Sequence, residues 1–170
     1  MNWTSLLSTM AGALIGIGST MVADRSRWKR DRRDHEQDVK RQVYAEYMAA
    51  LSRSRREIRF AASEPGMEVE QRAQLARESF NGGSKYELRY QISVIAPEDV
   101  VDAAATAFHA LRDLQDRVTE GHLRDSKPYA LAREEYDRSF ADLRHRIRSD
   151  IGSGNPRSAM RKRLPSSPSA

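Results

Sequence analysis

The sequence predicts an all-α protein: an N-terminal transmembrane helix that continues into a long stalk helix and an antiparallel helical bundle, followed by a disordered C-terminal tail. Three observations support this prediction. Residues 1–23 contain no ionisable side chain. Apolar residues recur at helical spacing in four stretches between residues 39 and 151. Residues 152–170 are basic and carry too little apolar surface to offset the entropy of ordering them.

The composition limits the classes of site that the chain can carry. With no cysteine, the sequence excludes disulfides, thiolate zinc sites, iron–sulfur clusters and cysteine nucleophiles. The formal net charge is +5, from 29 basic and 24 acidic residues. The basic excess lies beside the apolar N-terminal segment and in the tail, whereas the region between them is mildly acidic. This distribution favours a membrane surface over nucleic acid as the partner.

Residues 1–23 form the predicted transmembrane helix, because a helix of that length crosses a hydrocarbon core of roughly 30 Å. A cleaved signal peptide is the main alternative, although no basic residue precedes the apolar run. Whether the segment is retained or cleaved stays open at this point. The basic residues follow the span, so the positive-inside rule predicts a cell-membrane protein with its N-terminus outside and its C-terminal domain in the cytoplasm.

A ridge of small residues runs along the predicted span at a spacing of four. It includes a Gly-x-x-x-Gly pattern, which allows two membrane helices to approach closely and so predicts a homo-oligomer. The alternative is that small residues are simply common in such spans. The ridge consists of Ser8, Gly12, Gly16 and Thr20.

Residues 24–38 form the predicted basic stalk next to the membrane. Trp28 lies just beyond the span, where an indole rests at the depth of the headgroups while the neighbouring cations meet anionic lipid phosphates. The alternative is that Trp28 begins the apolar stripe of the following helix and packs on protein. The cations predicted to contact anionic lipid with it are Arg25, Arg27, Lys29, Arg30, Arg32 and Arg33.

The first two helices of the bundle are separated by Glu64-Pro65-Gly66, which ends the first of them. The second apolar stripe is interrupted at residues 81–84, which leaves open whether it is one kinked helix or two. Residues 86–94 also alternate with period two, as in a half-buried strand, but the chain offers no partner strand, so helix is preferred for 85–95. The predicted buried positions are Val39, Val43, Tyr47, Leu51, Ile58 and Ala62 in the first helix, then Val69, Ala73, Ala76, Phe80, Leu88, Ile92 and Ile95.

The last two helices have clear start signals. One begins at Pro97, with acidic residues at the positive end of the helix dipole, and closes at Gly121. The other opens at Ser126-Lys-Pro128 and ends at Gly152. Their predicted buried residues are Val100 or Val101, Ala104, Ala107, Phe108, Leu111, Leu114 and Val118, then Tyr129, Ala132, Tyr136, Phe140, Leu143, Ile147 and Ile151.

No group in the sequence is nominated as catalytic, as a metal ligand or as part of a cofactor site. None of the histidines lies in a metal-binding spacing, and we interpret all of them as surface residues. Carboxylates such as Glu134 and Asp142 pair instead with Arg138 and Arg146 at i,i+4 on exposed helix faces. The histidines are His35, His109, His122 and His145.

Two segments resemble a family. Arg41-Gln-Val-Tyr-Ala-Glu-Tyr-Met-Ala-Ala-Leu51 and Ile95-Ala-Pro-Glu-Asp-Val-Val-Asp-Ala-Ala104 are similar to packing motifs of uncharacterised actinobacterial single-pass membrane-anchored helical proteins. The resemblance implies a membrane-tethered helical domain and an actinobacterial source. It implies no activity and no site residue.

These observations favour a non-enzymatic, membrane-anchored interaction or scaffold protein that presents a cytoplasmic bundle to an unknown protein partner or to itself. The first alternative is a module that binds anionic lipid through the stalk. The second is a membrane-tethered protein that binds nucleic acid through the basic tail. An enzyme has the least support from the residues.

Overall fold

The computed structural model describes residues 35–64 and 66–153, and within those ranges it is all-helical, without strands. The predicted span over residues 1–23, most of the stalk and nearly all of the tail lie outside the described residues. The chain divides into two compact units, Met1–Val39 and Lys40–Ala170, and the helical bundle belongs to the second. None of the helices described is long and apolar enough to cross a membrane.

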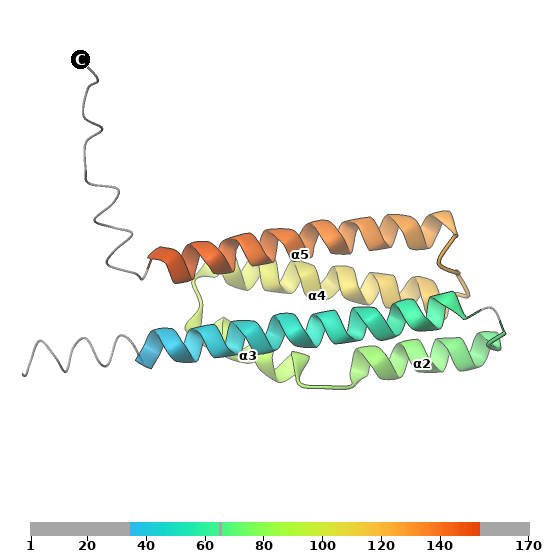
Figure 1. The fold of residues 1–170 in the computed structure, drawn as a ribbon, viewed down its shortest axis with the longest axis horizontal. Helices are drawn as coiled ribbons and strands as arrows, with labels where there is room; N and C mark the ends of the chain where they lie inside the picture. Colours follow the sequence, from blue (N-terminus) through green and yellow to red (C-terminus); the bar gives the residue numbers. More distant parts are fainter. Residues whose placement is uncertain (1–34, 65, 154–170) are drawn as a thin grey trace, which may run out of the picture. The chain divides into compact units, whose positions relative to one another are not determined.

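The helices form an antiparallel bundle in which two short helices occupy one of the positions (Figure 1). The first helix runs over residues 35–63 and ends before Glu64. Next come α2 (Val69–Asn81) and α3 (Lys85–Ile95), end to end in the ribbon, then α4 (Glu98–Thr119) and α5 (Lys127–Ser153). The predicted helical bundle is therefore confirmed, and α5 continues one residue past Gly152.

The core consists of the apolar stripes that the helical spacing predicts. On α4 every predicted position is buried, with Val100 rather than Val101 facing the core. Small residues on this helix, among them Ala104 and Ala107, let its neighbours pack closely. Tyr129, Tyr136, Leu143 and Ile147 of α5 are also buried. The positions that are only partly buried are Ile95, Ala132, Phe140 and Ile151.

Two predicted core residues are exposed. Val39 is 42% exposed and Val69 is 58% exposed. Val69 is the first residue of α2, so its side chain lies at the end of the helix stripe, where few residues cover it. In the first helix the buried face begins at Val43. Helical periodicity identifies the direction of a stripe but not where packing on it begins.

The structure decides between one kinked helix and two, and between helix and strand for residues 85–95. Residues 82–84 separate α2 from α3, with Gly83 at φ +80°. The preference for helix over strand in 85–95 is confirmed. Pro97 immediately precedes α4 as its N-cap rather than standing at its first position.

A buried guanidinium stabilises the turn between the first helix and α2. Arg72 is buried, and its Nε donates to the carbonyl of Ala61 at 3.2 Å. Its Nη2 donates to the carbonyls of Glu64 and Met67 at 3.2 and 2.9 Å. The last carbonyls of a helix have no partner within the helix, so Arg72 caps the C-terminal end of the first helix with charge-assisted hydrogen bonds.

A buried ammonium also donates hydrogen bonds to backbone carbonyls at the break between α2 and α3. Lys85 is 1% exposed, and its Nζ donates to the carbonyls of Gly82 and Ser79. The ammonium also lies 5.5 Å from the centre of the Phe80 ring. Burial lowers the pKa of Lys85, while the charges of Glu57 and Glu87 oppose that shift.

Four tyrosines lie buried between the first helix and its neighbours. The Tyr47 hydroxyl donates to the carbonyl of Ala104 at 2.9 Å, and the Tyr44 hydroxyl donates to Asp150 at 2.7 Å. Burial raises the pKa of each of the four phenols above the ordinary value near 10. The four are Tyr44, Tyr47, Tyr129 and Tyr136.

Candidate interaction surface

The outer face of α3 carries a row of apolar and aromatic side chains that are exposed in the part of the chain that the structure describes. Tyr86, Tyr90 and Val94 are 45%, 78% and 77% exposed. Their spacing of four places them one above another along a single side of the helix. We call these three residues the α3 stripe.

The α3 stripe is held on a rigid base. Leu88 and Ile92, on the opposite side of α3, are buried in the core and fix the rotation of the helix. The Tyr86 ring lies edge-on to Phe108 of α4, with the ring centres 5.1 Å apart. Arg89 lies over the same ring, 4.7 Å from the centre of Phe108. The stripe is thus anchored at Tyr86 and most exposed at Tyr90 and Val94.

The sequence pattern that indicates this surface is the alternation of apolar residues, which was considered only as evidence for a strand. Alternation of apolar residues from Tyr86 to Val94 is produced here by two helical rows on opposite faces. Leu88 and Ile92 form the inner row, and the α3 stripe forms the outer row. A helix that is apolar on two faces needs a partner on each face.

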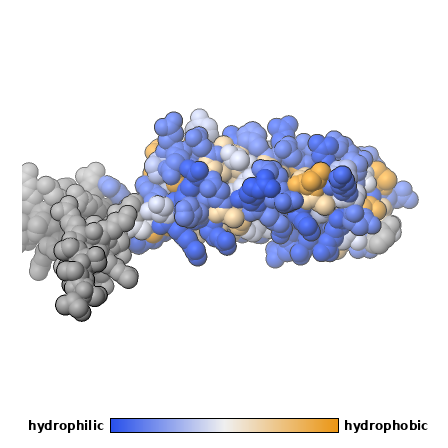
Figure 2. Space-filling model, turned by 90° about the horizontal axis from the view of Figure 1, so that it is seen from above, coloured by the Kyte–Doolittle hydropathy of each residue, from blue (hydrophilic) through white to orange (hydrophobic). Residues whose placement is uncertain are grey.

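The other large exposed apolar residues do not form such a row. In the part of the chain that the structure describes, Val39, Phe60, Val69 and Leu131 are exposed on different elements or far apart on one helix. Figure 2 shows the bundle from above, with hydrophilic residues over most of that face and apolar residues in small separate spots. The α3 stripe therefore differs from the ordinary scatter of apolar side chains on a surface.

On α5 the expected ion pairs are present. Arg138 lies 3.3 Å from Glu134, and Arg146 lies 2.8 Å from Asp142, as the i,i+4 spacing predicted. All four side chains are well exposed, so each pair adds only a few tenths of a kcal/mol. This face of α5 is therefore a charged, solvent-exposed surface and not a candidate interface.

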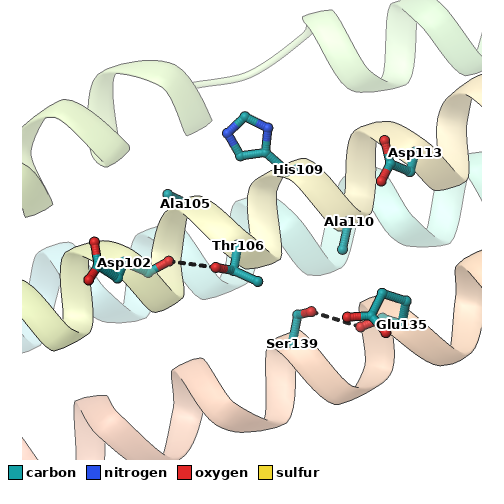
Figure 3. A pocket seen from close by; sticks show the side chains of 8 residues that line it. All are labelled: Asp102, Ala105, Thr106, His109, Ala110, Asp113, Glu135 and Ser139. Atoms are coloured by element: carbon teal, nitrogen blue, oxygen red, sulfur yellow. Dashed lines mark hydrogen bonds between the residues drawn. The ribbon is translucent and has the colours of Figure 1, made fainter.

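An open groove of about 480 Å³ lies between α4 and α5 (Figure 3). Asp102, His109 and Asp113 of α4 and Glu135 of α5 line it. Its hydroxyls are already occupied within their own helices: Thr106 donates to the carbonyl of Asp102, and Ser139 to that of Glu135. Figure 3 shows His109 pointing away from α5. Among the residues described, no three histidine, aspartate or glutamate side chains converge closely enough to hold a metal ion.

The residues predicted to act at the membrane lie outside the described residues. This applies to the self-association ridge of Ser8, Gly12, Gly16 and Thr20. It also applies to Trp28 and its basic neighbours in the stalk. Of the histidines, His35, His109 and His145 are exposed, and His122 is partly buried.

The chain was compared with known protein families, curated proteins and solved structures. No protein-family model matches the chain, and neither the curated proteins nor the solved structures yield a match.

Proposed function

We propose that this protein is a non-enzymatic, membrane-anchored interaction protein whose bundle docks on another protein molecule through the α3 stripe. The observation that carries the proposal is the exposure of Tyr86, Tyr90 and Val94 in one row on a helix whose other side is fixed in the core. Tyrosine supplies a large contact area at small entropic cost and is enriched at the energetic centres of protein interfaces. The partner is a second copy of the chain or a different protein.

The membrane anchor in this proposal rests on the sequence of residues 1–23 and on the basic residues that follow them. An anchor confines the bundle to two dimensions and raises its local concentration, which lets a contact surface of modest size act. Three side chains on one helix form the centre of such a modest interface rather than of an obligate one.

Site-specific photo-crosslinking in the native membrane tests the proposal. A photoreactive phenylalanine analogue replaces Tyr90 in the full-length protein, and the crosslinked product is identified by mass spectrometry. We expect a protein adduct from position 90 and none from Glu134, an exposed α5 position that serves as the control. The mass of the adduct distinguishes a second copy from a different partner. Adducts with lipid alone, or equal adducts from both positions, would contradict the proposal.

A charge-insertion pair provides the second test. Tyr90→Glu combined with Val94→Glu should lower capture of the partner at least about tenfold, because each substitution places a carboxylate in the apolar contact. Both residues are highly exposed, so the thermal midpoint should change little. The matched control is Leu131→Glu, an exposed apolar residue on α5, which should leave capture unchanged.

A further inference from the structure

Four arginines lie on the segments that meet where the first helix ends and α5 begins, the region of the buried Tyr129. Two of them, Arg55 and Arg59, stand one turn apart on the first helix, so they share a face. The third, Arg133, lies one turn after Tyr129 on α5, and the fourth, Arg124, lies in the turn before α5. We call these four residues the arginine cluster.

Contacts of Arg55 and Arg124 hold this part of the bundle in place. Arg55 donates to Asp137 of α5 at 2.6 Å and lies 5.5 Å from the centre of the Tyr136 ring. The backbone N–H of Arg124 donates to the carbonyl of Ala62 at 3.1 Å, which ties the turn before α5 to the end of the first helix. These contacts fix Arg55 and the backbone at Arg124, while Arg59, Arg124 and Arg133 are exposed at the surface.

Three of these guanidiniums have no carboxylate partner among the described residues. Arg59, Arg124 and Arg133 are exposed, and none forms an ion pair with any residue in the ranges 35–64 and 66–153. Arg59 lies one turn after Arg55 and Arg133 lies one turn before Asp137, so the antiparallel contact between Arg55 and Asp137 brings Arg59 and Arg133 to the same level of the bundle. The charges of all four arginines lower the pKa of Tyr129, against the larger effect of burial, which raises it. Within the described ranges, this end of the bundle therefore carries three unpaired guanidiniums beside Arg55, whose charge is offset by Asp137.

A cavity of about 410 Å³ opens beside the arginine cluster. It is lined by Ala62 and Ser63 at the end of the first helix and by Leu123, Arg124 and Asp125 in the turn before α5. Arg124 belongs to both the cavity and the cluster, and Arg59 lies one helical turn before Ser63, whose hydroxyl donates to the Arg59 carbonyl at 2.8 Å. The volume falls in the range of small-molecule sites, roughly 300–1,000 Å³.

We propose that the arginine cluster and this cavity bind the phosphate group of a small phosphorylated ligand. Planar guanidiniums bind phosphate through paired, charge-assisted hydrogen bonds, and several unpaired ones match the multiple negative charges of phosphate better than the single charge of a carboxylate. Asp125 is the one acidic residue that lines the cavity, and it limits the affinity. The site is separate from the α3 stripe and does not depend on the proposed docking function.

Titration calorimetry with sodium pyrophosphate tests this site in the full-length protein, reconstituted in phosphatidylcholine nanodiscs. Replacing two unpaired guanidiniums in the double variant Arg59→Gln/Arg133→Gln should weaken binding about tenfold or more. Asp125→Asn should strengthen binding, because it removes the carboxylate from the cavity. Both affected arginines are exposed, so a circular-dichroism melt close to that of the unmodified protein should show that the fold is kept.

The matched control removes the same charge from the same two helices. Arg56→Gln/Arg144→Gln changes exposed arginines that neither line the cavity nor belong to the arginine cluster, and it should leave pyrophosphate affinity within about twofold of the unmodified protein. An equal loss in the control and cluster variants would overturn the proposal, because it would show only a general attraction between a basic chain and an anion.

A second arm distinguishes a free phosphate from a lipid headgroup. The same variants are sedimented with vesicles of phosphatidylglycerol and phosphatidylcholine. Pyrophosphate binding that depends on the cluster assigns the site to a soluble ligand. Vesicle binding that depends on the cluster, without pyrophosphate binding, assigns the same phosphate chemistry to a lipid headgroup. If neither probe distinguishes the cluster variant from the control variant, the proposal is wrong.

Discussion

Tyr47 and Tyr136 are both buried in the core, but their hydroxyl groups have opposite environments. Tyr47 donates a hydrogen bond to the carbonyl of Ala104 at 2.9 Å. The Tyr136 hydroxyl has no hydrogen-bond partner among the residues that the structure describes. A buried hydroxyl stabilises a fold when it is paired and destabilises it when it is not. The same chemical change at the two positions should therefore have different effects.

We predict that Tyr47→Phe lowers the free energy of unfolding by about 1 kcal/mol, because it removes a buried hydrogen bond. Tyr136→Phe should leave the free energy of unfolding unchanged or raise it by up to about 1 kcal/mol, because it removes a desolvated hydroxyl and keeps the ring stacked on Phe140. Urea unfolding of both variants, followed by circular dichroism, measures the difference. Equal losses would show that the Tyr136 hydroxyl has a partner in solution.

Residue-scale chemistry was the part of the structure that the sequence predicted least well. Arg72 and Lys85 are charged, and nothing in their spacing indicated that they are buried. Their partners are backbone carbonyls, such as those of Ala61 and Gly82, which belong to every sequence equally. The same limit applies to the arginine cluster, whose members come from three separate segments that only the packing of the first helix on α5 brings together.

At the scale of elements, the break between α2 and α3 decides which face of the bundle remains open. Gly83 has φ +80°, a left-handed conformation that side chains with a Cβ adopt at a cost. Gly82 is also constrained, since a Cβ there would lie 3.0 Å from the carbonyl oxygen of Glu78. Because the break separates the two helices, the orientation of α3 about its own axis is not set by α2. In this orientation Leu88 and Ile92 are buried, while Tyr90 and Val94 are exposed.

We predict that Gly83→Ala lowers the free energy of unfolding by about 1 kcal/mol through backbone strain, because the space around its Cβ position is open and no clash contributes. Gly66→Ala is the control, since Gly66 lies in a turn with open space and without a left-handed φ. Gly66→Ala should be neutral or slightly stabilising. Chemical denaturation of both variants gives the comparison, and equal effects would contradict the strain at Gly83.

Elements were predicted well where one apolar stripe dominated and poorly where two competed. On α4 every position predicted from the spacing is buried, and the buried face also includes Ala103, Ala110 and Gln115, which were not predicted. On α3 two apolar rows overlap in the sequence, and helix was preferred only because the chain lacks a partner strand. The exposed row was consequently not recognised as a surface. At Val69 the stripe was extended one turn too far, to the end of the helix.

For the whole molecule, the buried phenols predict the response to alkaline pH. Burial raises their pKa values above the ordinary value near 10, so below pH 10 both the folded and the unfolded states are protonated. Above pH 10 the unfolded chain releases phenol protons that the folded chain retains, and stability falls by up to about 1.4 kcal/mol per pH unit for each phenol. Lys85 has the opposite effect. Burial lowers its pKa in the folded state, so its contribution to stability rises as the pH increases toward its ordinary pKa of 10.5.

We therefore expect the thermal midpoint to decrease steeply above about pH 10, with absorbance near 295 nm showing phenolate formation together with unfolding. Tyr136→Phe should make this decrease shallower, since one buried phenol no longer titrates in the unfolded state. Phenolate absorbance from all tyrosines well below the unfolding transition would show that the phenols are accessible to solvent and would contradict the prediction.

Asp150 accepts hydrogen bonds from both Lys40 and Tyr44, at 3.3 and 2.7 Å. This contact places the beginning of the first helix beside the end of α5, so the chain enters and leaves the bundle at neighbouring points. A domain with adjoining ends can be inserted into a surface loop of a host protein, or joined end to end and reopened elsewhere, without threading the chain through its core. The turn between α4 and α5, at the far end from Asp150, is the natural place to reopen it.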